Sequence, residues 1–401
     1  MLSGDILKQK IKGTKQRFSW YNNMISNREI QEINELPLMT ADILDQHYYQ
    51  AEVLEGLHLY QTSGTSGKAR KRIVYSEQDE LHYLQVKSKV YADFVQGDNL
   101  KRALADMGTG HAARTAIDVF THLGFECMSI SFELPVGEHI TQLESFRPEL
   151  LYTMPSLLEA ILLHAPDPKK FGIKKVILVG EIASRAWQIR AASELGITPD
   201  SIMDTYGCIE VGTMAYYSHA DGCYRLAENI RVEGIQPKDI DMEEQLQPDE
   251  SILVVTSLCR DYFPAIRYVT YDVVRDLRER VIDGVPQMTF SAIVKRVGKE
   301  LKHGEKISLY DIEEVVYRHI GDGRLRVQVQ NNVLVVYIQS STMFDEQIAV
   351  IEQELAQVIP EIGSMIRGGL IGGIQVIPVE HDGTMLSGTV KSKKLYYTQD
   401  E

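Results

Sequence analysis

Apolar residues follow two alternating patterns between positions 76 and 206. In some stretches they recur every three or four positions, which is the spacing of a helix with one buried face. The short stretches between them have the pattern of strands. The predicted helices are 76–95, 112–123, 138–146, 155–164 and 184–195, and the predicted strands are 102–107, 126–131, 150–153, 175–179 and 201–206. This alternation predicts parallel strands joined by crossover helices.

The pattern differs on either side of this region. Residues 1–56 are predicted to be mainly helical, and residues 212–293 to be rich in strands, with strands at 252–257, 264–269 and 288–293. The predicted elements of the last hundred residues are helix 310–319, strands 324–330 and 333–339, helix 345–358 and strand 374–378. We therefore predict an α/β protein of two domains. A large amino-terminal domain, 1–294, contains mostly parallel sheets flanked by helices and a β-rich subdomain, and a small α+β domain, 295–401, follows on a hinge.

The composition limits the classes of protein to which the chain can belong. Its 401 residues leave room for two or three domains. The net charge of −14 argues against general nucleic-acid binding, which needs a basic surface. The four cysteines are far apart and have no zinc-binding spacing with histidine, so we expect reduced thiols in a cytoplasmic protein. The amino terminus lacks the apolar core of a signal peptide, and no apolar run is long enough for a membrane span, so we expect no membrane association.

The strongest local signal is a run of small residues between positions 60 and 72. It reads Tyr-Gln-Thr-Ser-Gly-Thr-Ser-Gly-Lys-Ala-Arg-Lys-Arg. The glycines let successive backbone N–H groups point into one concavity, the hydroxyl groups add donors, and the lysine adds a positive charge. This surface suits a polyphosphate. The predicted phosphate-binding residues are Ser63, Gly64, Thr65, Ser66, Gly67 and Lys68.

This run is not a Walker P-loop. That motif requires Gly at position 62 and Ser or Thr at position 69, where the chain has Thr62 and Ala69. A P-loop also joins a strand to a helix, whereas residues 72–75 have the pattern of another strand. The next predicted helix begins after Ser76, which is placed to form a capping box with Asp79. We therefore predict a loop between two strands, with a plain surface turn as the alternative.

Two further motifs carry residue types that suit a nucleotide. The first, Tyr-Gly-Cys-Ile-Glu at 206–210, follows a predicted strand. Its aromatic ring suits a purine, and its carboxylate is a hard oxygen ligand that suits Mg²⁺. The second, Phe-Pro-Ala-Ile-Arg-Tyr-Val-Thr-Tyr-Asp, ends at Asp272. A carboxylate there can accept two hydrogen bonds from a ribose diol. A core aromatic residue and solvent-facing or turn carboxylates are the alternatives when each residue is taken alone.

With these three motifs, the chain resembles the adenylate-forming superfamily of acyl-CoA synthetases, and most closely its phenylacetate–CoA ligase branch. The run at 60–72 is similar to the phosphate loop of that superfamily. The resemblance implies that Tyr206 and Gly207 contact adenine and that Asp272 binds the ribose hydroxyls. It also implies that Glu210 holds Mg²⁺, with Thr65 as a second ligand. This chain has Ile where the family motif has Thr or Ser, one residue before the glutamate.

The resemblance implies further site residues after other predicted strands, because the ligands of such sheets collect beyond the carboxyl ends of the strands. Gly180 and Glu181 take the place of the family's adenine-lining segment. Gly108, His111 and Met154 follow other strands and are expected to line the acyl pocket. A hydrogen-bonded structural histidine is the alternative for His111.

The hinge and the carboxyl terminus depart from the family pattern. Residues 294–304 take the place of the hinge but lack its Asp, so Gly298 is the candidate pivot and Arg296 the candidate ribose contact. Near the carboxyl terminus, the run Gly-Thr-Val-Lys-Ser-Lys-Lys resembles the ending of the branch. It assigns Lys391 as the catalytic lysine, with Lys393 as the alternative. A solvated basic tail is the bland interpretation of the same run.

Taken together, the resemblance implies a ligase that uses ATP and Mg²⁺. A carboxylate attacks the α-phosphorus and expels pyrophosphate, and the acyl group then passes to a thiol of CoA or of a separate carrier protein. The branch favours an aryl acid as the small carboxylic acid substrate, and we predict a dimer. Two other hypotheses stay open: a phosphotransferase that releases ADP, and a nucleotide-binding protein without turnover.

Overall fold

The computed structural model describes residues 4–26, 30, 32–49, 56–61, 71–107, 111–131, 133–298, 307–330, 332–369, 371–379 and 395–397. The chain divides into two compact units, and each combines segments that are far apart in the sequence. The first unit contains Met1–Asn99, Arg114–Gly124 and Asp204–Ala292, and the second contains Leu100–Ala113, Phe125–Met203 and Ile293–Glu401. The predicted domain boundary between residues 294 and 295 stays a prediction.

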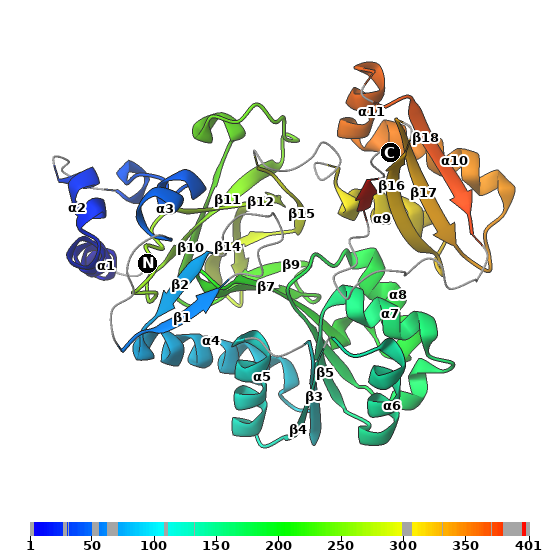
Figure 1. Cartoon of the computed structure of the whole chain (residues 1–401), viewed down its shortest axis with the longest axis horizontal. Coiled ribbons are helices and arrows are strands. Elements are labelled where there is room, and N and C mark those ends of the chain that lie inside the picture. The colour runs from blue at the N-terminus through cyan, green and yellow to red at the C-terminus, as the bar shows by residue number, and fades with distance from the viewer. Residues whose placement is uncertain are drawn as a thin grey trace. The chain divides into compact units, whose positions relative to one another are not determined.

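The first unit begins with short helices around one apolar cluster. They are α1 (Gly4–Arg17), α2 (Ser19–Ile25), η1 (Ile33–Glu35) and α3 (Ala41–His47), drawn in blue in Figure 1. The cluster comprises Tyr21, Ile25, Leu36, Met39 and Ile266. Thr40 caps α3 by accepting a hydrogen bond from the backbone N–H of Ile43. These helices confirm that the start of the chain is mainly helical over the described residues.

The small-residue run lies between two strands, as predicted. Strand β1 (His58–Gln61) pairs antiparallel with β2 (Arg72–Tyr75), and Gln61 is opposite Arg72. Residues 62–70 lie outside the described part of the chain. Helix α4 (Glu77–Val95) follows β2, and the predicted capping box of Ser76 and Asp79 is confirmed. Both strands and the start of α4 therefore fix the two ends of the predicted phosphate loop.

The rest of the first unit is antiparallel sheet, together with most of α5 (His111–His122). One sheet has the order β10-β11-β12, and β7 continues into β8, β9, β14 and β13 in another. The strands are β7 (Ile202–Cys208), β8 (Gly212–Ser218), β9 (Cys223–Leu226), β10 (Ile230–Ile235), β11 (Glu250–Ser257), β12 (Tyr268–Arg275), β13 (Arg278–Ile282) and β14 (Val285–Phe290), and a 3₁₀ turn, η4, spans Pro237–Ile240.

Two strand predictions in this region are wrong in their bounds. The predicted strand 264–269 begins only at Tyr268, because Arg267 has a positive φ of 52°, which breaks the extended backbone. Ala265 and Ile266 instead donate to carbonyls two residues earlier, in tight turns. The predicted strand 288–293 is two strands, β14 and β15 (Ala292–Arg296), separated at Ser291, whose amide bonds to the carbonyl of Arg275. Apolar periodicity does not reveal such turns.

The second unit contains the predicted parallel strands. Their order is β4 (Glu126–Ile130), β3 (Arg102–Asp106), β5 (Leu150–Thr153) and β6 (Lys175–Leu178), and every pair is parallel. Helices α6 (Val136–Phe146), α7 (Pro155–His164) and α8 (Arg185–Leu195) cover one face of these strands, as Figure 1 shows. The core between them centres on Trp187, which is fully buried. The 3₁₀ turns η2 (Pro168–Phe171) and η3 (Pro199–Ser201) join the elements. The predicted α/β layering is confirmed.

The carboxyl-terminal elements have an apolar core of their own. They are α9 (Leu309–His319), β16 (Arg324–Gln330), β17 (Val333–Gln339), α10 (Asp345–Val358), α11 (Pro360–Arg367), β18 (Gly373–Pro378) and β19 (Leu395–Tyr397). The sheet has the order β18-β17-β16-β19, and Asn332, with a φ of 60°, lies in the turn between the antiparallel strands β16 and β17. The predicted small α+β module is therefore present.

Within the second unit, a cluster of ion pairs connects β16 to α7 and α8. Arg190 and Arg324 both contact Glu159 and Glu194, with nitrogen–oxygen distances to Glu194 of 2.5 and 2.6 Å. The guanidinium of Arg190 also lies 5.6 Å from the ring centroid of Tyr317. Because these groups are largely buried, removing one partner would leave a charge without compensation and cost about 3–5 kcal/mol.

None of the described helices has the length and apolar composition that crossing a bilayer requires.

Candidate active site

In the first unit, Gly207 lets two strands approach closely beside the motif at 206–210. Strand β7 ends at Cys208, β8 begins at Gly212, and the register shifts between Tyr206 and Gly207. A Cβ atom at position 207 would lie 2.6 Å from the carbonyl oxygen of Gly212. Carbon and oxygen atoms do not approach so closely without a shift of the backbone, so the site requires a glycine here.

Replacing Gly207 by alanine is expected to lower the free energy of unfolding by about 1–3 kcal/mol, because the added methyl overpacks a rigid backbone contact. The measurement is thermal or urea unfolding. Gly137→Ala is the control, since a Cβ atom at that position meets no atom within 4 Å. Equal stability of the two variants would contradict this explanation of Gly207.

Tyr206 and Asp272, which come from separate motifs, are in direct contact. The Tyr206 hydroxyl donates a hydrogen bond of 2.6 Å to Oδ2 of Asp272. Burial, with the neighbouring Asp272 carboxylate, raises the pKa of Tyr206 well above its ordinary value, so the hydroxyl stays a donor. The Tyr206 ring meets Phe290 edge-on at 6.2 Å between centroids. The structure thus brings the predicted adenine and ribose residues together.

The arginine of the second motif has a structural role that the sequence did not show. Arg267 pairs with Glu233 at 2.7 Å and donates to the carbonyl oxygens of Asn34 and Leu36. Arg267 and Tyr271 both have a positive φ, so the backbone turns sharply on either side of the strand start. These contacts tie the amino-terminal helices to the strand that carries Asp272.

Glu210 lies on the turn after β7 and is only 8% exposed. Burial, with the carboxylate of Glu210 close by, raises the pKa of the Cys208 thiol well above its ordinary value. Among the described residues, no group of three or more His, Cys, Asp or Glu side chains could hold a metal ion. Mg²⁺ that is bound with a nucleotide commonly uses one or two carboxylates together with phosphate oxygens and water. A single carboxylate at Glu210 therefore fits that ion.

In the second unit, Glu181 caps a helix. Its two carboxylate oxygens accept from the backbone N–H and the hydroxyl of Ser156, both at 2.8 Å, at the start of α7. Gly180 precedes it with a φ of 82°, a left-handed conformation that favours glycine. Met154 lies in the apolar core and is 5% exposed. Their predicted nucleotide and acyl contacts stay predictions.

The remaining predicted residues are only partly described. His111 begins α5, and Arg296 is the exposed last residue of β15. The other predicted site residues lie outside the described residues: Ser63, Gly64, Thr65, Ser66, Gly67, Lys68, Gly108 and Lys391. The structure therefore tests neither the phosphate loop nor the catalytic lysine.

Sequence reasoning missed a buried histidine–carboxylate pair in the second unit. Nδ1 of His139 lies 2.7 Å from Oδ1 of Asp106, at the end of β3, and neither side chain is exposed. Burial lowers the pKa of His139, but the hydrogen bond and charge of Asp106 outweigh this and raise it. The signal in the sequence was an aspartate that ends an apolar run.

A second missed acid, Asp204, lies on β7, two residues before Tyr206. Its Oδ2 accepts from the hydroxyl of Tyr224, and its Oδ1 has no hydrogen-bond partner among the described residues. Burial raises the pKa of Asp204 from 3.8 to about 7. Between these values the folded chain binds the proton that the unfolded chain releases, so stability falls as pH rises.

Replacing Asp204 by asparagine is therefore expected to stabilise the protein at pH 8, by up to about 4 kcal/mol, with little gain near pH 4. Urea unfolding at several pH values measures the difference. Asp200→Asn, at an exposed position, serves as the control and is expected to show no such trend. A gain that is the same at both pH values would contradict the assignment to ionisation.

Comparison with known proteins decides the family. The family model described as "Fumarate--diaminopropanoate ligase C-terminal domain" matches residues 302–382. The chain is 34% identical over 381 residues to fumarate–(S)-2,3-diaminopropanoate ligase of Enterobacter agglomerans, and the match covers 94% of this chain and 95% of that protein. The chain belongs to the adenylate-forming ligase superfamily.

Solved structures agree on the fold of this adenylate-forming ligase. A 2-hydroxyisobutyryl-CoA ligase, solved in an open conformation with 2-HIB-AMP and CoA, superposes with a TM-score of 0.59 at 13% identity. That match covers 99% of this chain and 90% of the other. An anthranilate CoA ligase in complex with anthranoyl-AMP gives a TM-score of 0.52 at 12% identity and covers 90% and 73% of the two chains. The predicted fold is therefore confirmed.

Proposed function

We propose that this chain activates a small carboxylic acid as an acyl-adenylate and transfers the acyl group to an amine, which forms an amide. The observation that carries the proposal is the relative of 34% identity along nearly the whole chain, whose name joins fumarate to a diamino acid. A dicarboxylic acid and an amino acid with a second amino group are therefore the substrate classes we assign first.

The reaction has two steps. A carboxylate oxygen attacks the α-phosphorus of ATP, and the bond to the bridging oxygen breaks, so that pyrophosphate leaves. A neutral amine then attacks the acyl carbon, the bond to the AMP oxygen breaks, and the nitrogen loses a proton to solvent. Neither step needs a covalent enzyme intermediate, so positioning and charge neutralisation supply the rate.

Each proposed residue has one task in this chemistry. Asp272 accepts hydrogen bonds from the ribose hydroxyls, and the Tyr206 hydroxyl holds that carboxylate in place. Lys391 neutralises charge that develops at the carboxylate and the bridging oxygen. Residues 63–68 hold the β- and γ-phosphates. Mg²⁺, when bound, neutralises phosphate charge, and Glu210 is the described carboxylate that suits it.

The thiol acceptor and aryl acid of the sequence prediction remain the second candidate. The phenylacetate–CoA ligase signature that ends at Asp272 favours them, whereas the relative along the whole chain favours an amine. A carrier protein as thiol donor, a dimer and a cytoplasmic location also stay predictions.

A panel of acids and acceptors tests the proposal. Fumarate, succinate, benzoate and phenylacetate are each incubated with ATP and Mg²⁺, and with 2,3-diaminopropanoate, serine, CoA or no acceptor. Pyrophosphate release and mass spectrometry of the products are measured. We expect a dicarboxylate and the diamine to give an amide and AMP, and serine, which lacks the second amine, to give much less. A thioester as the only product would overturn the amine assignment.

A further inference from the structure

Two buried side chains, Tyr75 and Arg260, donate hydrogen bonds to the turn that carries Glu210. The hydroxyl of Tyr75 donates to the carbonyl oxygen of Ile209 at 2.6 Å. Nε of Arg260 donates to the carbonyl oxygen of Glu210 itself at 3.0 Å. Consecutive carbonyl groups of one turn are thus each fixed by a separate donor, which leaves the backbone of Glu210 little freedom.

The two donors form one rigid unit. The guanidinium carbon of Arg260 lies 3.7 Å from the centroid of the Tyr75 ring, so the cation stacks on the aromatic face. Nη2 of Arg260 donates to the carbonyl oxygen of Val74 at 2.5 Å, and Nη1 lies 2.6 Å from Oδ2 of Asp79. Arg260 is 3% exposed, and its guanidinium is held by a carbonyl or carboxylate on each side.

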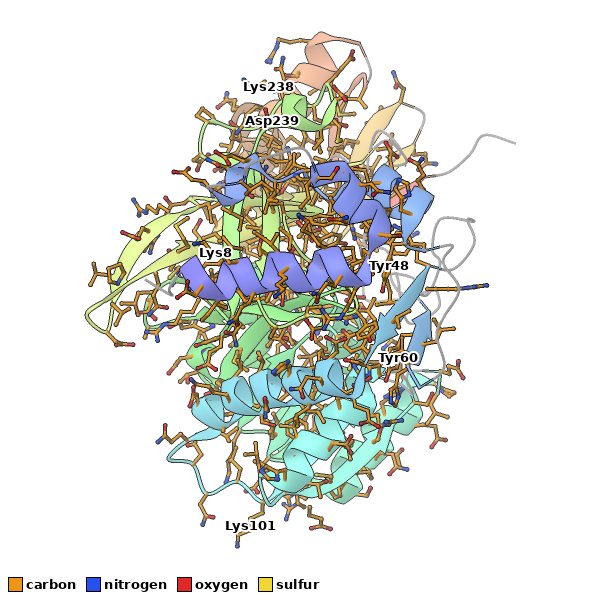
Figure 2. The ribbon with its side chains drawn as sticks, turned by 90° about the vertical axis from the view of Figure 1, so that its left-hand side faces the viewer. Lys8, Tyr48, Tyr60, Lys101, Lys238 and Asp239 are labelled. Atoms are coloured by element: carbon orange, nitrogen blue, oxygen red, sulfur yellow. The ribbon has the colours of Figure 1, made fainter. Side chains whose placement is uncertain are left out.

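The loop that supplies Arg260 is itself anchored. The carboxylate of Asp79 accepts from the backbone N–H groups of Asp261 and Tyr262, at 2.6 and 3.1 Å. Lys10, from α1, donates to the carbonyl oxygen of Arg260. Tyr48, which follows α3 and is labelled in Figure 2, donates to the carbonyl oxygen of Tyr262 at 2.7 Å. Residues of the amino-terminal helical segment therefore hold the loop that carries Arg260 in place.

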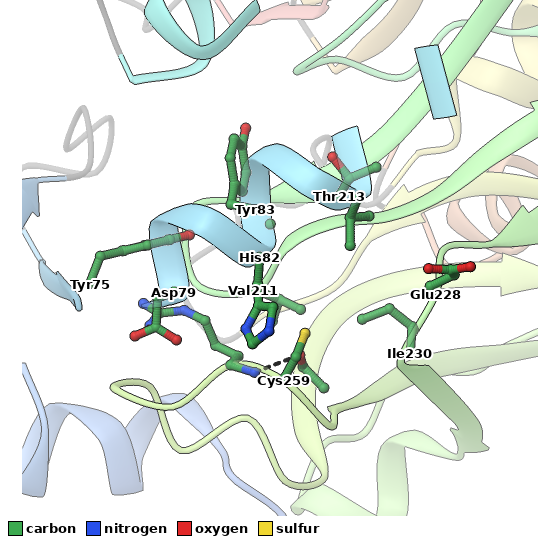
Figure 3. Close-up of a pocket in the computed structure, with 13 residues that line it drawn as sticks. Tyr75, Asp79, His82, Tyr83, Val211, Thr213, Glu228, Ile230 and Cys259 are labelled. Atoms are coloured by element: carbon green, nitrogen blue, oxygen red, sulfur yellow. Dashed lines mark hydrogen bonds and ion pairs between the residues drawn. The ribbon is translucent and has the colours of Figure 1, made fainter. Parts of the chain in front are cut away.

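A pocket lies beside the turn that carries Glu210. It has a volume of about 350 Å³, including its solvent-open part, and Tyr75, Asp79 and Arg260 line it together with Val211 and Gly212, the residues that follow Glu210. Figure 3 shows Tyr75, Asp79 and Val211 around it. Tyr75 and Arg260 thus both line this pocket and donate to the turn of Glu210.

We propose that Arg260 and Tyr75 are positioning residues that orient Glu210 toward a nucleotide-bound Mg²⁺. This inference rests on the metal-binding role of Glu210 in the proposed function. The contacts given above support this inference. The sequence motif does not, because Arg260 lies outside residues 206–210. Partners that orient a metal ligand commonly change metal affinity or activity by about 10–100-fold when they are lost.

The test compares Arg260→Lys and Tyr75→Phe with the wild-type protein. Arg260→Lys keeps the charge but cannot span the carbonyl groups of Val74 and Glu210, and Tyr75→Phe removes only one hydroxyl. The readouts are calorimetric titration of ATP with Mg²⁺ or with EDTA, and the Mg²⁺ dependence of pyrophosphate exchange. We expect the Mg²⁺ concentration for half-maximal exchange to rise about 10–100-fold in Arg260→Lys and less in Tyr75→Phe, with ATP binding in EDTA unchanged.

Arg267→Lys is the matched control. Arg267 is also a largely buried arginine that holds backbone carbonyls, but it does not contact the turn of Glu210. We expect it to lower the unfolding temperature without moving the Mg²⁺ dependence. Variants with wild-type Mg²⁺ dependence and normal exchange would overturn the positioning role alone. Absence of exchange in a wild-type protein that still binds ATP with Mg²⁺ would overturn the proposed function alone. ATP binding that does not respond to Mg²⁺ in the wild-type protein would overturn both.

Discussion

Replacing Lys391 by alanine is expected to lower the rate of acid-dependent ATP–pyrophosphate exchange by about 10²–10³-fold, which is the typical loss when one well-placed donor is removed from a site of this kind. The reason is electrostatic. Charge moves onto the bridging oxygen as pyrophosphate leaves, and an ammonium group stabilises this charge only if it is held close to it. The KM for ATP is expected to change much less, because the loss falls on the transition state.

Lys393→Ala is the control for this prediction. It lies two residues away in the same basic run, so it removes an equal charge from the same segment. We expect its exchange rate to stay within a few-fold of the wild-type rate. If Lys393→Ala loses exchange while Lys391→Ala keeps it, the catalytic lysine is misassigned. If neither variant loses exchange, the run is a solvated tail.

Replacing Asp272 by alanine is expected to raise the KM for ATP by about 10- to 150-fold, because hydrogen bonds to a charged group contribute about 1.5–3 kcal/mol. The variant removes the proposed acceptor for the ribose hydroxyls and also leaves the buried Tyr206 hydroxyl without the partner that it has at 2.6 Å. The measurement is the rate of pyrophosphate exchange against ATP concentration.

Two comparisons separate these effects. Tyr206→Phe removes the hydroxyl but keeps the ring and the carboxylate, so we expect a smaller rise in KM than in Asp272→Ala. The wild-type protein is expected to prefer ATP over 2′-deoxy-ATP, and Asp272→Ala to lose that preference. An Asp272→Ala variant that discriminates as well as the wild-type protein would place the ribose contact elsewhere.

The layered fold could be read from the sequence because its periodicity is strong. Strand β5 and helix α7 are largely apolar and almost entirely buried, and their bounds match the prediction. Turns fixed by a single residue could not be read in this way. The positive φ of Arg267 that delays β12 depends on contacts with Glu233 and with distant carbonyl groups. Local pattern does not contain those contacts.

The candidate site likewise contains residues that could be predicted from the sequence and residues that could not. Tyr206 and Asp272 each lie in a contiguous motif, and the structure brings their side chains into direct contact. Arg260 and Tyr75 could not be found from the sequence, because their role depends on carbonyl groups contributed by other segments. Glu181 was predicted to line the adenine site. In the structure both of its carboxylate oxygens accept hydrogen bonds from Ser156.

The central claim is that ATP is cut between its α- and β-phosphates only when a carboxylic acid is present. The direct measurement is incubation with ATP labelled at the α-phosphate, Mg²⁺ and the acid panel, followed by separation of the nucleotides. We predict labelled AMP, and an equal amount of pyrophosphate, with one class of acid and none without acid. Labelled ADP, or AMP that forms equally well without any acid, would contradict the claim.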